Sequence, residues 1–137
     1  MTKILCVDDE PMNLRMYSRI LNVLGEVVTA DDGQESLDIF TKSPLDYDLI
    51  VTDNDMPRLS GLQFLAKIIG YEKPPRLMIS GTENPILLHA AVRTVKGLGL
   101  YEKPFKNDEL KTIAGELLQY GRSPALDEYF RKKGFPF

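Results

Sequence analysis

The fold can be inferred outward from residues 49–57, which read LIVTDNDMP. A short apolar run here leads into a turn that carries two carboxylates. Runs that are apolar throughout are typical of strands in a sheet whose two faces are both covered. Four other short runs bounded by polar turns share this pattern. We therefore predict strands at residues 4–7, 27–30, 49–52, 77–80 and 99–101.

Longer stretches with apolar residues at helical spacing separate these runs. They predict helices at residues 12–24, 33–42, 60–70, 84–96 and 107–120. The alternation of strands and helices predicts a parallel α/β sheet with helices on both faces. The chain is too short for a barrel, so we expect an open, doubly wound sheet. Such sheets bind ligands beyond the carboxyl ends of their strands, where the strand order reverses.

The composition is that of one ordinary globular domain of 137 residues. With 17 basic and 20 acidic residues the net charge is −3, which argues against direct binding to nucleic acid. No apolar run approaches the ~20 residues of a membrane span, and acidic residues interrupt the short apolar N-terminus, so we expect no signal peptide. The single cysteine, Cys6, forms no internal disulfide and indicates a reducing, cytoplasmic location.

Polar side chains follow four of the predicted strands. Asp8 and Asp9 follow the first, Asp53 follows the third, Ser80 ends the fourth and Lys103 follows the fifth. In the flavodoxin-like strand order 2-1-3-4-5, strands 1 and 3 flank the switch point, so the three aspartates should converge. Two carboxylates ~4 Å apart repel by roughly 4 kcal/mol at an effective dielectric of ~20. Oxygen ligands in an incomplete, solvent-facing cage suit Mg²⁺.

The same residues suit a phosphoryl group. Mg²⁺ and Lys103 would neutralise its charge, and the Ser80 hydroxyl would donate to one of its oxygens. A carboxylate held at a metal can act as the phosphoryl acceptor. Asp53 is the best candidate because it follows a central strand, whereas the two acids after the first strand are also placed to cap the next helix.

Four motifs in this order, each after a predicted strand, resemble the receiver domain of two-component response regulators, the CheY-like family. The resemblance covers residues 3–120 and implies a flavodoxin-like sheet with strand order 2-1-3-4-5 and five helices. We expect a receiver domain at residues 1–121, and an extension at 122–137 that forms a short extra helix. The motifs are Asp8-Asp9-Glu10, Asp53-x-x-Met56-Pro57, Ser80-Gly81 and Lys103-Pro104-Phe105.

The resemblance implies a role for each acid. Asp53 would accept a phosphoryl group from the phosphohistidine of a sensor histidine kinase or a phosphotransfer protein. Asp9 and Asp53 would bind Mg²⁺ through their side chains, and Asp55 through its backbone carbonyl. Asp8 would act mainly through a metal-bound water.

The resemblance also implies that Lys103 bridges to the phosphoryl group, that Ser80 is a switch hydroxyl, and that the peptide bond before Pro104 is cis. Two positions depart from the family pattern. The aromatic residue usual three positions before the lysine is Leu100 here, followed by Tyr101, which should point to the opposite face of its strand. An acidic side chain, Asp55, stands two positions after the acceptor, at the rim of the site.

The partner surface is less defined. The resemblance places the downstream target protein at helix 84–96, strand 99–101 and helix 107–120, and leaves a phosphorylation-dependent dimer open. Helix 84–96 is apolar on more than one stripe, which fits either deep burial or an exposed patch.

We expect a stand-alone signalling phosphoacceptor rather than an enzyme. Three alternatives stay open. The first is a degenerate receiver that binds proteins without phosphorylation, which Leu100 motivates. The second is a small phosphatase of the haloacid-dehalogenase type, although that family places its paired aspartates after strand 1. The third is a flavin-binding module, although acids stand here where a hydroxyl- and glycine-rich loop would be needed.

Overall fold

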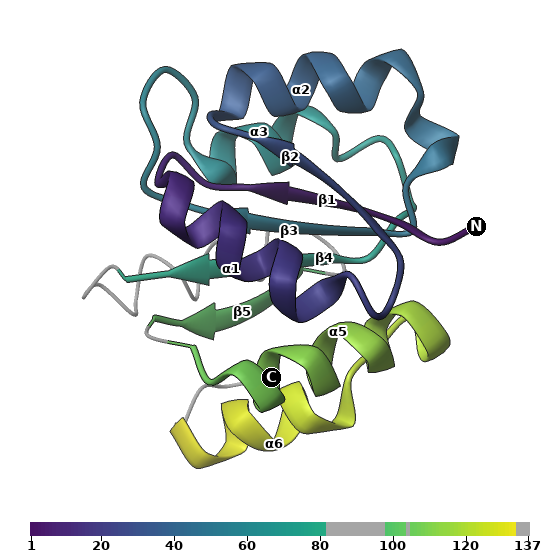
Figure 1. The fold of residues 1–137 in the computed structure, drawn as a ribbon, viewed down its shortest axis with the longest axis vertical. Coiled ribbons are helices and arrows are strands. Elements are labelled where there is room, and N and C mark those ends of the chain that lie inside the picture. Colours follow the sequence, from purple (N-terminus) through teal and green to yellow (C-terminus); the bar gives the residue numbers. More distant parts are fainter. Residues whose placement is uncertain (82–97, 104, 134–137) are drawn as a thin grey trace.

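The computed structural model describes residues 1–81, 98–103 and 105–133. Its centre is a parallel sheet of five strands in the order β2-β1-β3-β4-β5 (Figure 1). The predicted strand order is confirmed, and each strand is one or two residues longer than predicted. The strands are β1 (Lys3–Val7), β2 (Glu26–Ala30), β3 (Leu49–Asp53), β4 (Arg76–Ser80) and β5 (Leu98–Glu102).

Five α-helices and one short 3₁₀ helix accompany the sheet within the described residues. The predicted helix at residues 84–96 lies outside them. None of the described helices is long and apolar enough to cross a membrane. The helices are α1 (Pro11–Leu21), α2 (Gly33–Lys42), η1 (Pro44–Asp46), α3 (Gly61–Lys67), α5 (Asn107–Tyr120) and α6 (Pro124–Lys133).

Two helices end earlier than their apolar pattern predicted. The last turn of α1 tightens, with Leu24 N–H donating to the Leu21 carbonyl, and this leaves Val23 65% exposed rather than in the core. Helix α3 stops before Ile68, whose carbonyl accepts a hydrogen bond from the Arg76 guanidinium at 3.1 Å. A buried arginine on β4 thus satisfies a carbonyl group at the end of α3.

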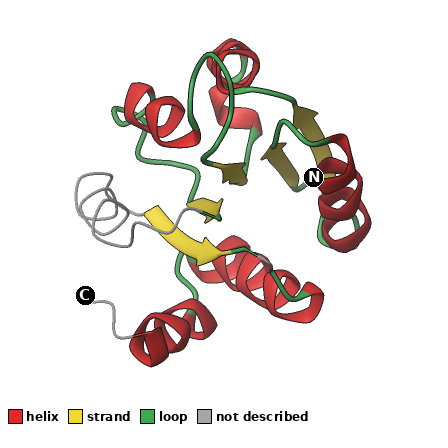
Figure 2. Cartoon of the chain, turned by 90° about the vertical axis from the view of Figure 1, so that its left-hand side faces the viewer, coloured by secondary structure: helices red, strands yellow, loops and turns green. Residues whose placement is uncertain are grey.

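The strands place alternate side chains into two apolar layers, one on each face of the sheet. Helices α2 and α3 cover one layer, and α1, α5 and α6 cover the other. Figure 2 shows the strand ends between these two groups of helices. Leu100 belongs to the first layer and Tyr101 to the second, so the predicted alternation in β5 is confirmed.

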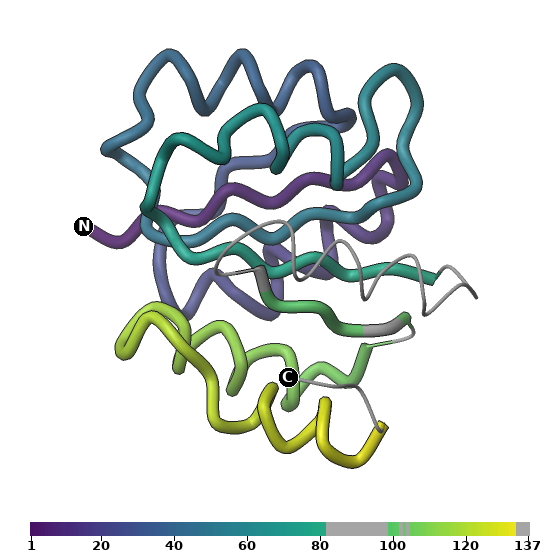
Figure 3. The backbone as a smooth tube through the Cα atoms, turned by 180° about the vertical axis from the view of Figure 1, so that it is seen from behind, coloured from purple at the N-terminus to yellow at the C-terminus, as the bar shows by residue number. Residues whose placement is uncertain are grey.

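Helix α6 lies against β5 and α5, and runs beside α5 in both Figure 1 and Figure 3. The Ser123 hydroxyl oxygen accepts from Leu126 N–H at 3.0 Å and thereby caps its first turn. Leu126 is 4% exposed and sits over Gly99, where an added Cβ would lie 2.6 Å from Leu126 Cδ2. The Tyr129 ring packs on Tyr101 at 4.8 Å between centroids. The short C-terminal helix is therefore part of the packed structure.

Candidate functional site

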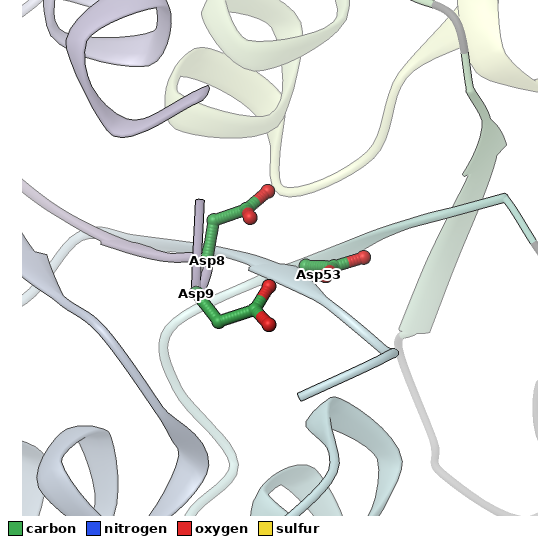
Figure 4. A group of neighbouring side chains, drawn as sticks. All are labelled: Asp8, Asp9 and Asp53. Carbon is green, nitrogen blue, oxygen red and sulfur yellow. The ribbon is translucent and has the colours of Figure 1, made fainter. Parts of the chain in front are cut away.

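Three aspartates meet at the carboxyl ends of two adjacent strands. Asp8 and Asp9 follow β1, and Asp53 ends β3, which pairs directly with β1. One carboxylate oxygen from each lies within 4.8 Å of the others. The three side chains extend toward the same side of the strand ends (Figure 4). Asp8 is fully buried and Asp53 is 2% exposed, whereas Asp9 faces solvent. The structure thus brings together the acids that the sequence analysis grouped.

Lys103 supplies the positive charge of this site. It follows β5, and its backbone N–H donates to the Ser80 carbonyl at 2.9 Å, which holds the loop against β4. Its ammonium nitrogen lies 3.1 Å from Asp53 Oδ1 and 3.4 Å from Asp8 Oδ2. Burial would lower the pKa of Lys103, but the two carboxylates outweigh burial and raise it. One cation is therefore shared by two buried anions.

Asp53 is the least satisfied of the buried acids. Burial raises the pKa of its carboxyl group, the charge of Asp8 adds to this rise, and Lys103 offsets part of it. The Lys103 ammonium is within ion-pair distance of Oδ1, yet no donor among the described residues makes a well-directed hydrogen bond to that oxygen. At 3.1 Å the two opposite charges attract each other, although the pair lacks the alignment of a hydrogen bond. Oδ1 is thus a buried anionic oxygen with coordination to spare.

These residues fit Mg²⁺. They provide hard oxygen ligands from two strand ends, one of them with spare coordination. Because Asp9 is exposed, the cluster also opens to solvent, and Mg²⁺ usually retains several waters when a protein binds it. A divalent cation would also relieve the repulsion among the three carboxylates.

Asp8 is held by protein donors that the sequence analysis did not single out. Its Oδ1 accepts from Glu10 N–H at 2.9 Å, and its Oδ2 accepts from the Tyr17 hydroxyl at 3.0 Å and from Asn13 Nδ2 at 3.2 Å. Asn13 and Tyr17 are four residues apart and so share one face of α1. The spacing of Asn13 and Tyr17, shortly after the acids that end β1, was the feature of the sequence that could have indicated these donors.

The other predicted residues lie around this centre. Ser80 is buried at the end of β4, the strand that pairs with β3. Asp55 lies in the loop after β3 with an exposed side chain, and its charge contributes to the raised pKa of Asp53. Pro104 lies outside the described residues, and with it the cis peptide bond implied there.

The loop after β3 is held close to Asp53 at the end of that strand. A Cβ on Gly61 would lie 2.0 Å from the Asp53 carbonyl oxygen, so only glycine allows this approach. Asn54 Oδ1 accepts from Leu62 N–H at 3.0 Å. Arg58, at a φ of 65°, forms an ion pair with Asp32 at the start of α2. These contacts hold the loop in place next to the end of β3.

Comparisons with known proteins agree with this geometry. A chemotaxis protein CheY homolog of Campylobacter jejuni is 30% identical over 125 residues, which is 87% of this chain and 94% of that protein. The osmosensing histidine protein kinase SLN1 of Saccharomyces cerevisiae is 30% identical over 122 residues, or 83% of this chain. The two-component response regulator ARR12 of Arabidopsis thaliana is 28% identical over 113 residues, or 81% of this chain. The chain spans only 10% of the yeast protein and 19% of the plant protein.

Solved structures give the same result. The chemotaxis protein CheY4 of Vibrio cholerae superposes with a TM-score of 0.71 at 32% identity, covering 80% of this chain and 92% of that one. A response regulator receiver domain protein from Clostridium thermocellum has a TM-score of 0.70 at 27% identity and covers 98% of both chains. The sequence model described as the response regulator receiver domain matches residues 4–114, which run from the second residue of β1 through β5 and include the whole acidic cluster. With this match over most of its length, the chain belongs to the response regulator receiver domain family of two-component signalling.

Proposed function

We propose that this receiver accepts a phosphoryl group on Asp53 from the phosphohistidine of a sensor histidine kinase or a phosphotransfer protein. The observation that carries the proposal is the buried Asp53 carboxylate, whose Oδ1 is paired with the Lys103 ammonium but lacks a well-directed hydrogen bond. A carboxylate in this state is available both as a nucleophile and as a metal ligand. Receiver domains act as signalling phosphoacceptors rather than as classical enzymes.

In this proposal Asp9 and Asp53 would hold Mg²⁺ through their carboxylates, and Asp55 through its backbone carbonyl. Asp8 would contribute mainly through a bound water. When bound, Mg²⁺ supplies positive charge that offsets the charge of the transferring phosphoryl group.

The chain's own residues perform the remaining steps. An Asp53 carboxylate oxygen attacks phosphorus, the bond between phosphorus and the donor imidazole nitrogen breaks, and the imidazole leaves with the bonding pair and takes up a proton. Lys103 bridges to the added phosphoryl group, and the Ser80 hydroxyl donates to one of its oxygens. The new charge of about −1.5 to −2 draws both residues toward Asp53 and shifts a conformational equilibrium.

We propose that the output is binding of a downstream target protein at β5, α5 and the predicted helix 84–96, which lies outside the described residues, with residues 122–137 as an extension of the receiver. Receiver domains interact with kinases or phosphotransfer proteins and with targets. Leu100 is 1% exposed in the layer that faces α2 and α3. Without an aromatic ring at this position, the switch relies on Ser80 and Lys103. The alternative is a degenerate receiver that binds its partner without phosphorylation.

The test is intact mass spectrometry after incubation with acetyl phosphate and Mg²⁺. We expect one added phosphoryl group in the wild type and none in Asp53→Asn or with a chelator. Asp55→Asn is the matched control, because it removes an exposed acid and keeps the backbone carbonyl. Absence of an adduct and of fluoroberyllate binding would refute phosphorylation and support the degenerate receiver. Absence of an adduct with normal fluoroberyllate binding would show rapid hydrolysis, in which case Asp55→Asn should lengthen the lifetime.

A further inference from the structure

We propose that Tyr17 is a positioning residue for this site: its hydroxyl orients Asp8 for Mg²⁺ and keeps the Lys103 ammonium on Asp53. This inference rests on the proposed function and adds to it a residue of α1 that lies outside the four motifs of the acidic site.

The placement of Tyr17 is fixed by packing. Its side chain is fully buried under the strand ends, and its ring packs on Phe105 with centroids 5.3 Å apart and planes at 31°. The carboxylate oxygen of Asp8 accepts, so the Tyr17 hydroxyl is the donor in this contact. A rigid aromatic ring thus delivers one hydrogen bond to one carboxylate oxygen, Asp8 Oδ2.

Three donor groups lie close to this one oxygen. Asp8 Oδ2 lies 3.0 Å from the Tyr17 hydroxyl, 3.2 Å from Asn13 Nδ2 and 3.4 Å from Lys103 Nζ. The other oxygen, Oδ1, accepts from Glu10 N–H at 2.9 Å. Both oxygens therefore have protein donors, which set the rotation of the carboxylate. Outer partners that orient the groups around a metal typically change its affinity by 10–100-fold when they are removed, and because Asp8 would act through a metal-bound water we expect the lower end of that range for Tyr17.

The same contact decides where Lys103 sits. Its ammonium is closer to Asp53, at 3.1 Å, than to Asp8, at 3.4 Å. The Tyr17 hydroxyl takes up hydrogen-bonding capacity of Asp8 Oδ2 and satisfies part of its charge. Without that hydroxyl, Asp8 attracts the ammonium more strongly, and Lys103 moves away from the acceptor. Tyr17 therefore directs a shared cation toward the carboxylate that is to be phosphorylated.

The test uses Tyr17→Phe in the full chain, because this variant keeps the ring and its packing on Phe105 and removes only the donor. We expect the Kd for Mg²⁺, measured by calorimetric titration with MgCl₂ alone, to rise about tenfold. We also expect the ¹⁵N resonance of the Lys103 ammonium to shift in the metal-free protein. Tyr101→Phe is the matched control. Tyr101 is also buried, and its hydroxyl oxygen accepts from Lys106 N–H at 3.4 Å rather than contacting an acid of the cluster.

The outcomes separate this inference from the proposed function. A Kd for Mg²⁺ within twofold of wild type in Tyr17→Phe, with an unchanged Lys103 resonance, overturns the inference even if Asp53 is phosphorylated normally. A tenfold weaker Kd supports the inference even if Asp53 accepts no phosphoryl group, a result that would refute the function alone. Should Tyr17→Phe fail to fold, Asn13→Ala provides the second variant. It removes another donor from the same oxygen and should weaken Mg²⁺ binding, and wild-type affinity in it would count against the inference.

Discussion

Replacing Asp53 with Asn should stabilise the metal-free protein. The substitution keeps the size of a side chain that is 2% exposed and removes its charge. Burial and the neighbouring Asp8 raise the pKa of Asp53 despite the Lys103 ammonium, so the ionised form is disfavoured in the folded state. At neutral pH Asp53 is ionised in both states. The ionised form is unfavourable only in the folded protein, where the side chain is buried, so it lowers the free energy of unfolding.

The magnitude follows from three contributions. Oxygens of Asp8 and Asp53 within 4.8 Å repel by about 3.5 kcal/mol at an effective dielectric of ~20. Lys103 Nζ at 3.1 Å from Asp53 returns about 5 kcal/mol at the same dielectric. Removal of a carboxylate from water costs several kcal/mol and decides the sign. We expect the free energy of unfolding to rise by about 1–3 kcal/mol.

The assay is urea denaturation of wild type and Asp53→Asn in EDTA, with the slopes compared to confirm that only stability changes. The difference should be largest at pH 7. A raised native pKa means that the unfavourable charge appears as pH rises through the window that begins near the ordinary value of ~3.9. The difference should therefore close as pH falls below about 4. Saturating Mg²⁺ should stabilise the wild type and narrow the gap, by about 2.7 kcal/mol at 100 times Kd.

Equal or lower stability of Asp53→Asn at pH 7 in EDTA would refute this reasoning, as would a gap that does not close in acid. The control is Asp55→Asn, which removes a nearby exposed charge. It should change the free energy of unfolding by no more than about 0.5 kcal/mol.

Four further substitutions test how the loop after β3, helix α6 and helix α2 are held. Gly61→Ala puts a Cβ 2.0 Å from the Asp53 carbonyl oxygen and should lower the free energy of unfolding in urea by about 1–3 kcal/mol; a loss under about 0.5 kcal/mol would contradict the close approach. Leu126→Ala should lower the free energy of unfolding by about 2–4 kcal/mol and remove hydrogen-exchange protection from α6. Gly99→Ala, which crowds Leu126 Cδ2 at 2.6 Å, should also remove it, and full protection in both would disprove the docking. Asp32→Ala removes the side chain that caps α2 through Glu35 N–H. It should lower the free energy of unfolding by about 1 kcal/mol, measured by thermal melting, and an unchanged Tm would count against that cap.

Much of the fold could be predicted because it depends on local patterns. Five apolar runs gave five strands, and the convergence of Asp8, Asp9 and Asp53 followed from the fact that parallel strands end at one edge of the sheet. The bounds of α2 and α5 agreed with their apolar spacing because polar or glycine residues flank both helices.

The remainder depends on contacts between distant elements. The carbonyl of Ile68, just after α3, is bound by Arg76 of β4, and no periodicity within α3 predicts this contact. The sequence alone does not distinguish Tyr17 from its neighbours in α1, because only tertiary packing buries Tyr17 fully and leaves the adjacent Met16 half-buried. The role of a buried tyrosine hydroxyl becomes clear only when its acceptor is known, which here is Asp8.

Because α6 docks on β5 and α5, it competes with any other protein that would bind the surface it covers. A short tether keeps such a segment at an effective concentration on the order of millimolar. A free protein that binds the same surface must therefore displace it, and its apparent affinity falls by the fraction of molecules in which the surface is uncovered. With ten residues, α6 is shorter than the ~12–15 that an isolated helix needs in water. Its release would therefore also unfold it, so that access to the surface is governed by a local folding equilibrium.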